Sequence, residues 1–247
     1  MTINKKMMKR LTIALVPILI LMLLGFLYLT GAFYKTKIPA ALMYHSISDR
    51  SAQVSAKNFE KQMKYLSENG YTFLFSEEIR DCDKYEKPII ITFDDGYRDN
   101  YDAGFDILKK YNAKATIYMI TDYIGKDGFL TEEQIKEMEE SGLVRVDPHT
   151  HNDTDLSQLT SEHIHFQIEK SNAVLKEITG REPKTFAYPY GGFDEESKEI
   201  AAEYYEVAFA VENGSQKDLS AVYRKSITNR CMLFNMRAFK KYTKTTR

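Results

Sequence analysis

The chain has 247 residues, of which 43% are hydrophobic, and its 34 basic and 35 acidic residues leave a formal net charge of −1. This length and composition suit one α/β domain with a real hydrophobic core. The basic residues form no concentrated face of the kind that binds nucleic acid, so a nucleic-acid partner is excluded. Cys82 and Cys231 lie 149 positions apart, and this spacing leaves open whether they pair.

The first 34 residues have the pattern of a membrane anchor. A flank with four basic residues over 1–10 precedes 24 residues without a charge over 11–34. As a helix, that run would be about 36 Å long, enough to cross a hydrocarbon core of about 30 Å. A cleaved signal peptide is the alternative, but its apolar region is usually about 7–15 residues long. We therefore predict a cytoplasmic flank over 1–10, a single transmembrane signal-anchor over 11–34 and an extracytoplasmic domain over 35–247.

Short apolar runs alternate with amphipathic stretches along the rest of the chain. The apolar runs predict strands over 38–43, 89–92, 115–120, 143–146, 185–187 and 207–211. The amphipathic stretches predict helices over 55–70, 105–111, 131–142, 161–180 and 195–205. This alternation favours a mostly parallel sheet, either open or closed into a barrel. In both architectures the loops after the carboxyl ends of the strands form the functional site.

The first candidate site follows the predicted strand over 89–92. The segment 92–97 reads Thr-Phe-Asp-Asp-Gly-Tyr and places two adjacent carboxylates, Asp94 and Asp95, at the end of that strand. Such carboxylates are costly at a buried strand end unless something neutralises them. A divalent cation could bind one of them and leave the other free as a base. An Asp-rich turn at a helix start is the simpler alternative.

The second candidate site is the segment 147–155, which also follows a predicted strand. It reads Asp-Pro-His-Thr-His-Asn-Asp-Thr-Asp, and therefore combines His149 and His151 with several carboxylates. Imidazole and carboxylate groups are ligands of zinc and of similar metals. A polar loop without a function is the alternative, although two of the chain's five histidines at one strand end favour a metal site.

The third candidate is an aromatic turn over 186–192. It contains Tyr188, Pro189 and Tyr190, followed by two glycines. Pro and Gly favour a rigid turn. Its aromatic rings, like the ring of Tyr97 in the first segment, offer faces on which a sugar could stack. Taken singly this pattern is weak, because aromatic turns more often pack than bind.

Taken in order, these segments resemble the polysaccharide deacetylase (NodB-homology) family, carbohydrate esterase family four. Residues 92–96 match its T-F-D-D-G motif, and Tyr188-Pro189-Tyr190-Gly191 is similar to its third motif. Residues 41–47, with Tyr44-His45-Ser46-Ile47, are similar to the leading strand of a subgroup that opens with Y-H-x-I. The resemblance extends over residues 38–211, most of the predicted outer domain.

The resemblance implies an α/β fold, namely a distorted (β/α) barrel of about seven parallel strands, here preceded by one N-terminal transmembrane helix. It implies Asp94 as the general base and Asp95 and His149 as metal ligands. The backbone N–H of Tyr190 would face the developing oxyanion. Zinc is the expected metal, with cobalt, nickel or manganese as alternatives. The implied reaction is metal-assisted hydrolysis of an acetamide to acetate and a free amine.

Three positions depart from the family pattern. The family has a second histidine four positions after the first, where this chain has Asp153. Because a carboxylate can bind zinc, we predict Asp153 as the third ligand, with His151 as a possible substitute. The family also has an arginine that braces the catalytic aspartate, where this chain has Ala187. No histidine follows His165, so we predict that His45, at the end of the first strand, supplies the catalytic histidine.

These features predict a hydrolase that removes N-acetyl groups from N-acetylglucosamine-type cell-wall or surface polysaccharide. A catalytically impaired relative that binds glycan without cleaving it is one alternative, which Asp153 keeps open. A hydrolase of O-acetyl esters is a further alternative. The expected partners are an N-acetylated polysaccharide and, through residues 11–34, the cell membrane.

Overall fold

The computed structural model of the protein describes residues 39–50, 53–211, 214–215 and 218–228, together with Met22, Met236, Phe239, Lys240 and Thr243. Within this part of the chain, no helix combines the length and the apolar sequence needed to cross a membrane. The predicted anchor over 11–34 lies outside the described residues except for Met22. Cys82 is buried, whereas Cys231 lies outside the described residues. The anchor and the state of the two cysteines therefore stay predictions.

Strands and helices alternate in the described chain, as the sequence predicts. The strands are β1 (Ala40–Tyr44), β2 (Thr72–Leu74), β3 (Pro88–Asp95), β4 (Ala115–Met119), β5 (Val144–Pro148), β6 (Thr185–Ala187), β7 (Val207–Ala210), β8 (Val222–Tyr223) and β9 (Lys225–Ser226). The α-helices are α2 (Ala56–Glu68), α3 (Asp106–Tyr111), α4 (Glu132–Glu140), α5 (Ser161–Thr179) and α6 (Glu195–Tyr204). The shorter helical segments are η1 (Ser76–Lys84), the π-helix η2 (Asn100–Phe105), η3 (Thr121–Tyr123), η4 (Leu156–Gln158) and η5 (Pro189–Gly191).

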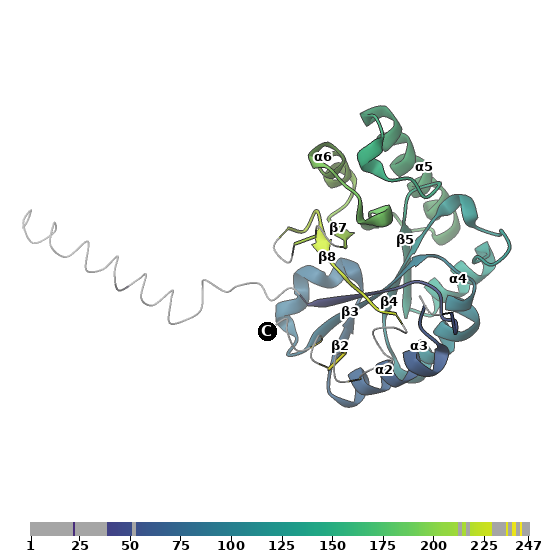
Figure 1. Ribbon diagram of the computed structural model, residues 1–247, viewed down its shortest axis with the longest axis vertical. Coiled ribbons are helices and arrows are strands. Elements are labelled where there is room, and N and C mark those ends of the chain that lie inside the picture. The colour runs from purple at the N-terminus through teal and green to yellow at the C-terminus, as the bar shows by residue number, and fades with distance from the viewer. Residues whose placement is uncertain are drawn as a thin grey trace, which may run out of the picture. The chain divides into compact units, whose positions relative to one another are not determined.

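Every pairing between the named strands is parallel. One sheet has the order β5-β4-β3-β1-β9, with β2 beside the start of β3, and the other has the order β6-β7-β8. Only Arg224 separates β8 from β9, so residues 222–226 lead from β7 in one sheet to β1 in the other. The α/β fold with parallel strands is therefore confirmed. The curved arrangement in Figure 1 is consistent with the predicted distorted barrel.

The two sheets also meet between β5 and β6, which the described structure does not join by strand pairing. At this seam, Asp147 of β5 accepts hydrogen bonds from the backbone N–H (3.1 Å) and the hydroxyl of Thr185 on β6. Arg181 donates to the other oxygen of Asp147 at 2.9 Å and to the carbonyl of Val146 at 3.0 Å. A buried carboxylate thus replaces the hydrogen bonds that a strand ladder would supply.

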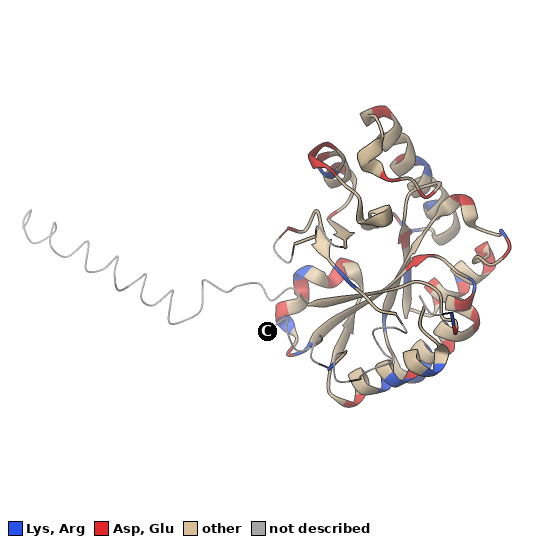
Figure 2. Ribbon diagram, viewed as in Figure 1, with Lys and Arg blue, Asp and Glu red and all other residues tan. Residues whose placement is uncertain are grey.

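The two faces of β3 pack against different parts of the molecule. Successive residues of a strand point to opposite faces, and residues 89, 91 and 93 pack in the cluster beneath helices α2, α3 and α4. Ile90 packs in a second cluster, with apolar residues of β6, β7 and β8. Thr92 and Asp94 share the face of Ile90 and therefore point into the interior between the two sheets. Charged residues gather mainly on the surrounding helices and loops, as Figure 2 shows.

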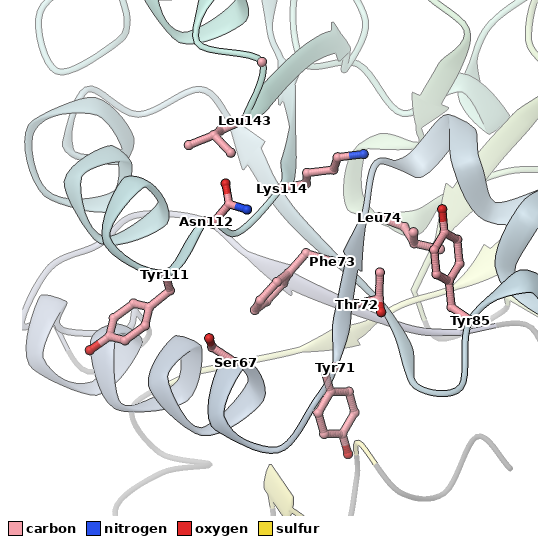
Figure 3. Close-up of a pocket in the computed structure, with 11 residues that line it drawn as sticks. Ser67, Tyr71, Thr72, Phe73, Leu74, Tyr85, Tyr111, Asn112, Lys114 and Leu143 are labelled. Carbon is pink, nitrogen blue, oxygen red and sulfur yellow. The ribbon is translucent and has the colours of Figure 1, made fainter.

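A cavity of about 540 Å³ lies near the amino ends of the strands. It is lined by Phe73 and Leu74 of β2, by Tyr111 and Lys114 before β4, and by Leu143 before β5 (Figure 3). The motifs singled out in the sequence follow the carboxyl ends of the strands instead. The cavity is therefore separate from the predicted site.

Candidate active site

Asp94 lies near the carboxyl end of β3 and is only 2% exposed. Arg224 contacts both of its oxygens, with Nη1 2.6 Å from Oδ1 and Nη2 2.7 Å from Oδ2. Arg224 is itself fully buried and also donates to the hydroxyl of Thr92 at 3.0 Å. Burial, the largest influence, raises the pKa of Asp94, but the charges of Arg224 and His149 help to bring that pKa below its usual value. Asp94 is therefore held as a buried anion.

Asp95 ends β3 with a left-handed backbone, at φ 71. This conformation is uncommon for a residue with a side chain, and it interrupts the regular alternation of the strand. Gly96 follows at φ 81, and an added Cβ would lie 2.0 Å from Sδ of Met119, so a residue with a side chain would be strained here. Burial raises the pKa of Asp95, and the nearby His149 only partly opposes this shift. The backbone geometry thus brings both carboxylates to one site.

His149 follows β5 directly, and its side chain is buried. Its Nδ1 donates to the backbone carbonyl of Ala187 at 2.7 Å. Its Nε2 lies 3.8 Å from Oδ1 of Asp95. Metal-binding histidines commonly have their second ring nitrogen fixed by a carbonyl or a carboxylate in this way. The structure therefore leaves Nε2 on the side of the predicted metal ligands.

Asp153 adds a third ligand group at the same place. One possible ligand atom from each of Asp95, His149 and Asp153 lies within 4.8 Å of the other two. The carboxylates of Asp94 and Asp153 both raise the pKa of Asp95, which marks a site with an excess of negative charge. Two carboxylates and an imidazole are a donor set that suits zinc and related divalent cations. The three predicted ligands are brought together, and their chemistry fits a metal.

His151 lies outside the ligand cluster and contacts Thr121 and Phe166 instead. The alternative prediction, in which His151 replaces Asp153 as a metal ligand, is therefore wrong. Nδ1 of His151 forms a hydrogen bond with the hydroxyl of Thr121 at 2.9 Å, and its ring meets the edge of Phe166. The side-chain oxygen of Gln167 accepts hydrogen bonds from the backbone N–H groups of His151 (3.0 Å) and of the next residue (3.2 Å). These bonds hold the loop after β5 with His151 turned away from the ligand cluster.

The aromatic turn after β6 requires a second correction. Tyr188 is fully buried, its ring packs against Phe186 and Phe193, and its hydroxyl donates to the carbonyl of Ser220. Pro189 is buried as well. The predicted contact of Tyr188 and Pro189 with a sugar does not fit this structure, because both side chains pack inside the domain.

Tyr190 is the exposed member of the turn, with 73% of its surface accessible. Its backbone is left-handed, at φ 59. Its hydroxyl donates to Oδ2 of Asp153 at 2.8 Å. The side chain of the predicted oxyanion residue therefore contacts one of the predicted metal ligands.

His45 lies directly after β1, where Asn100 donates to its backbone carbonyl at 2.7 Å. The charge of His45 lowers the pKa of both Asp94 and Asp95, so its imidazole lies near the two carboxylates. This position agrees with a role for His45 in proton transfer.

Tyr97 lies at the edge of the same site. Its ring stacks on Phe129, with centroids 5.2 Å apart and an interplanar angle of 20°, so one of its two faces is covered. Burial, followed by the charge of Asp95 and a hydrogen bond with it, raises the pKa of the Tyr97 hydroxyl to about 12. The Tyr97 hydroxyl therefore stays neutral beside Asp95.

Arg224 is the site residue that the motifs did not reveal. It lies 130 positions after Asp94, between the two-residue strands β8 and β9. It braces Asp94, the task that the family pattern gives to an arginine at the position of Ala187. The one sequence signal is a single arginine directly after the apolar and aromatic residues 221–223. The brace is thus present, but it comes from the residue between β8 and β9 rather than from β6.

The parallel α/β fold, the braced Asp94 and the cluster of Asp95, His149 and Asp153 agree with the family resemblance found in the sequence. The sequence profile described as polysaccharide deacetylase matches residues 82–206. YxkH of Bacillus subtilis (strain 168), assigned to the polysaccharide deacetylases, is 37% identical over 204 residues, which cover 78% of this chain and 73% of YxkH. The poly-β-1,6-N-acetyl-D-glucosamine N-deacetylase of Staphylococcus aureus is 31% identical over 159 residues, which cover 58% of this chain and 55% of the relative.

A solved structure agrees with these relatives. The crystal structure of BC0361, a polysaccharide deacetylase from Bacillus cereus, has a TM-score of 0.76 and 33% sequence identity, and the match covers 83% of this chain and 68% of BC0361. The chain therefore belongs to the polysaccharide deacetylase family. The prediction of an enzyme of the deacetylase class is confirmed.

Proposed function

We propose that the protein removes N-acetyl groups from an N-acetylglucosamine polysaccharide in a reaction that depends on a divalent metal, with zinc as the first candidate. The observation that carries this proposal is the braced anion of Asp94 beside the ligand cluster of Asp95, His149 and Asp153. The Staphylococcus aureus relative, named for poly-β-1,6-N-acetyl-D-glucosamine, favours an acetamide over an ester as the bond cleaved.

Asp95, His149 and Asp153 would hold the metal. When bound there, a divalent cation polarises the acetamide carbonyl and lowers the pKa of water. Asp94 is adjacent to Asp95, but both of its carboxylate oxygens already bond to Arg224. This contact favours Asp94 as a base rather than as a fourth metal ligand.

The proton transfers would use two groups, Asp94 on β3 and His45 directly after β1. Asp94 takes a proton from the attacking water as the oxygen of that water bonds to the carbonyl carbon. The backbone N–H of Tyr190 stabilises the resulting oxyanion. His45, on the loop after β1, gives a proton to the sugar nitrogen as the C–N bond breaks. The products are acetate and a free amine.

We also propose that this reaction takes place outside the cell on a membrane-anchored protein. The support comes from the uncharged run over 11–34 and the basic flank over 1–10. Wall or surface glycan is the substrate available in that location.

The experiment measures acetate release from a β-1,6-linked N-acetylglucosamine oligomer by the purified full chain. We expect no release after removal of metal with a chelator and recovery when zinc, manganese or cobalt is added back. Acetate from O-acetylated but not N-acetylated oligomers would support an esterase. A folded protein that binds the oligomer but releases no acetate with any metal would support the glycan-binding alternative, to which the Asp153 position pointed.

A further inference from the structure

The hydroxyl of the exposed residue Tyr190 contacts one member of the ligand cluster. It lies 2.8 Å from Oδ2 of Asp153, although the two residues are 37 positions apart in the chain. Tyr190 belongs to the turn after β6 and Asp153 to the loop after β5. Both residues have a left-handed backbone at φ 59. The contact therefore joins two separate loops at residues whose backbones are unusual for side-chain-bearing amino acids.

We infer that Tyr190 is a positioning residue for the proposed metal ligand Asp153: its hydroxyl holds Oδ2 and thereby fixes the orientation of this carboxylate in the cluster with Asp95 and His149. This inference rests on the proposed metal-dependent function and adds a residue to that site.

A hydrogen-bond partner of this kind can orient a carboxylate ligand before the metal binds. The terminal torsion of aspartate is broad and roughly two-fold, so either oxygen could turn toward a metal. A donor on one oxygen removes this freedom before the metal binds. Carboxylates that bind metals are commonly hydrogen-bonded in this way, and their partners contribute measurably to affinity.

One of the other two ligands has a comparable partner. The carbonyl of Ala187 fixes Nδ1 of His149. The bond from Tyr190 gives Asp153 a partner of the same kind. It differs from the bond to His149 in one respect, because the ring of Tyr190 is exposed to solvent and the bond of His149 is buried.

The test is a zinc-affinity measurement on the full chain, stripped of metal and titrated in competition with a chromophoric chelator. Tyr190→Phe removes the hydroxyl and keeps the ring. Tyr204→Phe is a matched control, because the hydroxyl of Tyr204 also donates to a carboxylate, Glu169, at 2.9 Å on the exposed surface. We expect Tyr190→Phe to weaken zinc binding about 10- to 100-fold and Tyr204→Phe to leave it unchanged.

A double-mutant cycle then shows whether Tyr190 acts through Asp153. If it does, Tyr190→Phe has no further effect on zinc affinity in an Asp153→Ala background. Equal zinc affinity of the wild type and Tyr190→Phe, or an undiminished effect in the Asp153→Ala background, would overturn the inference and leave the proposed function intact. A wild-type protein that binds no zinc, manganese or cobalt would overturn the metal dependence as well.

Discussion

Two aspartate–arginine pairs, each with a buried carboxylate, lie in this molecule, and the arginines hold their partners differently. Asp94 pairs with Arg224 at the site, and Asp147 pairs with Arg181 at the seam between β5 and β6. Both carboxylates are 2% exposed. Arg224 is fully buried and binds both oxygens of Asp94, whereas the side chain of Arg181 is 19% exposed and contacts one oxygen of Asp147.

The protonation of the two carboxylates differs accordingly. Burial raises the pKa of both, and for Asp94 the neighbouring positive charges, first that of Arg224, reverse this shift. For Asp147 they do not, because Arg181 also binds Glu139 and the charge of Glu139 opposes ionisation of Asp147. A dedicated, bidentate arginine keeps Asp94 as an anion, as the proposed base requires, whereas the shared Arg181 contacts β5 next to β6.

The largest effects should come from neutralising the two aspartates. Asp94→Asn removes the proposed base, so we expect acetate release to fall about 10²–10⁴-fold while zinc remains bound. Asp147→Asn should lower the unfolding temperature but leave the rate per folded molecule nearly unchanged. Acetate release, zinc content and thermal unfolding of both variants check this contrast. If folded Asp147→Asn lost as much activity as Asp94→Asn, the proposed difference between the two aspartates would be wrong.

Replacing each arginine tests whether its charge controls the pKa of the aspartate that it contacts. Arg224→Met leaves Asp94 buried without its partner, which should cost about 3–5 kcal/mol of unfolding free energy. It should also raise the pKa of Asp94. Because Asp94 acts as a base only when ionised, the acid limb of the pH–rate profile should move to higher pH.

Arg181→Met is the matched control for that profile. We expect a smaller loss of stability, since Arg181 is partly exposed, and an acid limb at the wild-type position. An unshifted limb in Arg224→Met, measured in folded protein, would mean that Arg224 does not control Asp94.

The smallest contrast involves two fully buried threonines. Thr92 accepts a hydrogen bond from Arg224, and Thr185 donates to Asp147 and lies 3.0 Å from the hydroxyl of Tyr118. Valine at either position leaves a buried polar group without a partner, at a cost of about 1–3 kcal/mol. Denaturant unfolding measures this loss in both variants. Only Thr92→Val should also reduce acetate release. A similar reduction in Thr185→Val would contradict the assignment of Thr185 to the seam between β5 and β6 rather than to the active site.

Much of the fold followed from local patterns. The uninterrupted apolar run of β3 and the periodic residues of α2 and α5 predicted their type and approximate position correctly. The order of strands and helices predicted parallel pairing and placed the site at the carboxyl ends. Asp94, Asp95 and Gly96 stood out because paired carboxylates and a glycine at the end of a buried strand need a chemical reason.

The parts that were missed depend on contacts between distant residues. Strands β2, β8 and β9 have only two or three residues each, too few to show a period. Arg224 belongs to no motif, and its role is visible only in the folded structure, where its side chain reaches Thr92 and Asp94 of β3. Tyr188 was misplaced because an aromatic residue in a turn has the same local pattern whether it packs or binds.

Anomalous diffraction from a metal-soaked crystal of the full chain tests the central assignment most directly. We predict one bound ion with ligands from one carboxylate oxygen of Asp95, Nε2 of His149 and one oxygen of Asp153, while both oxygens of Asp94 remain on Arg224. An ion bound by Asp94 or by His151, or a well-ordered site that holds no ion, would contradict the division between base and ligands described above.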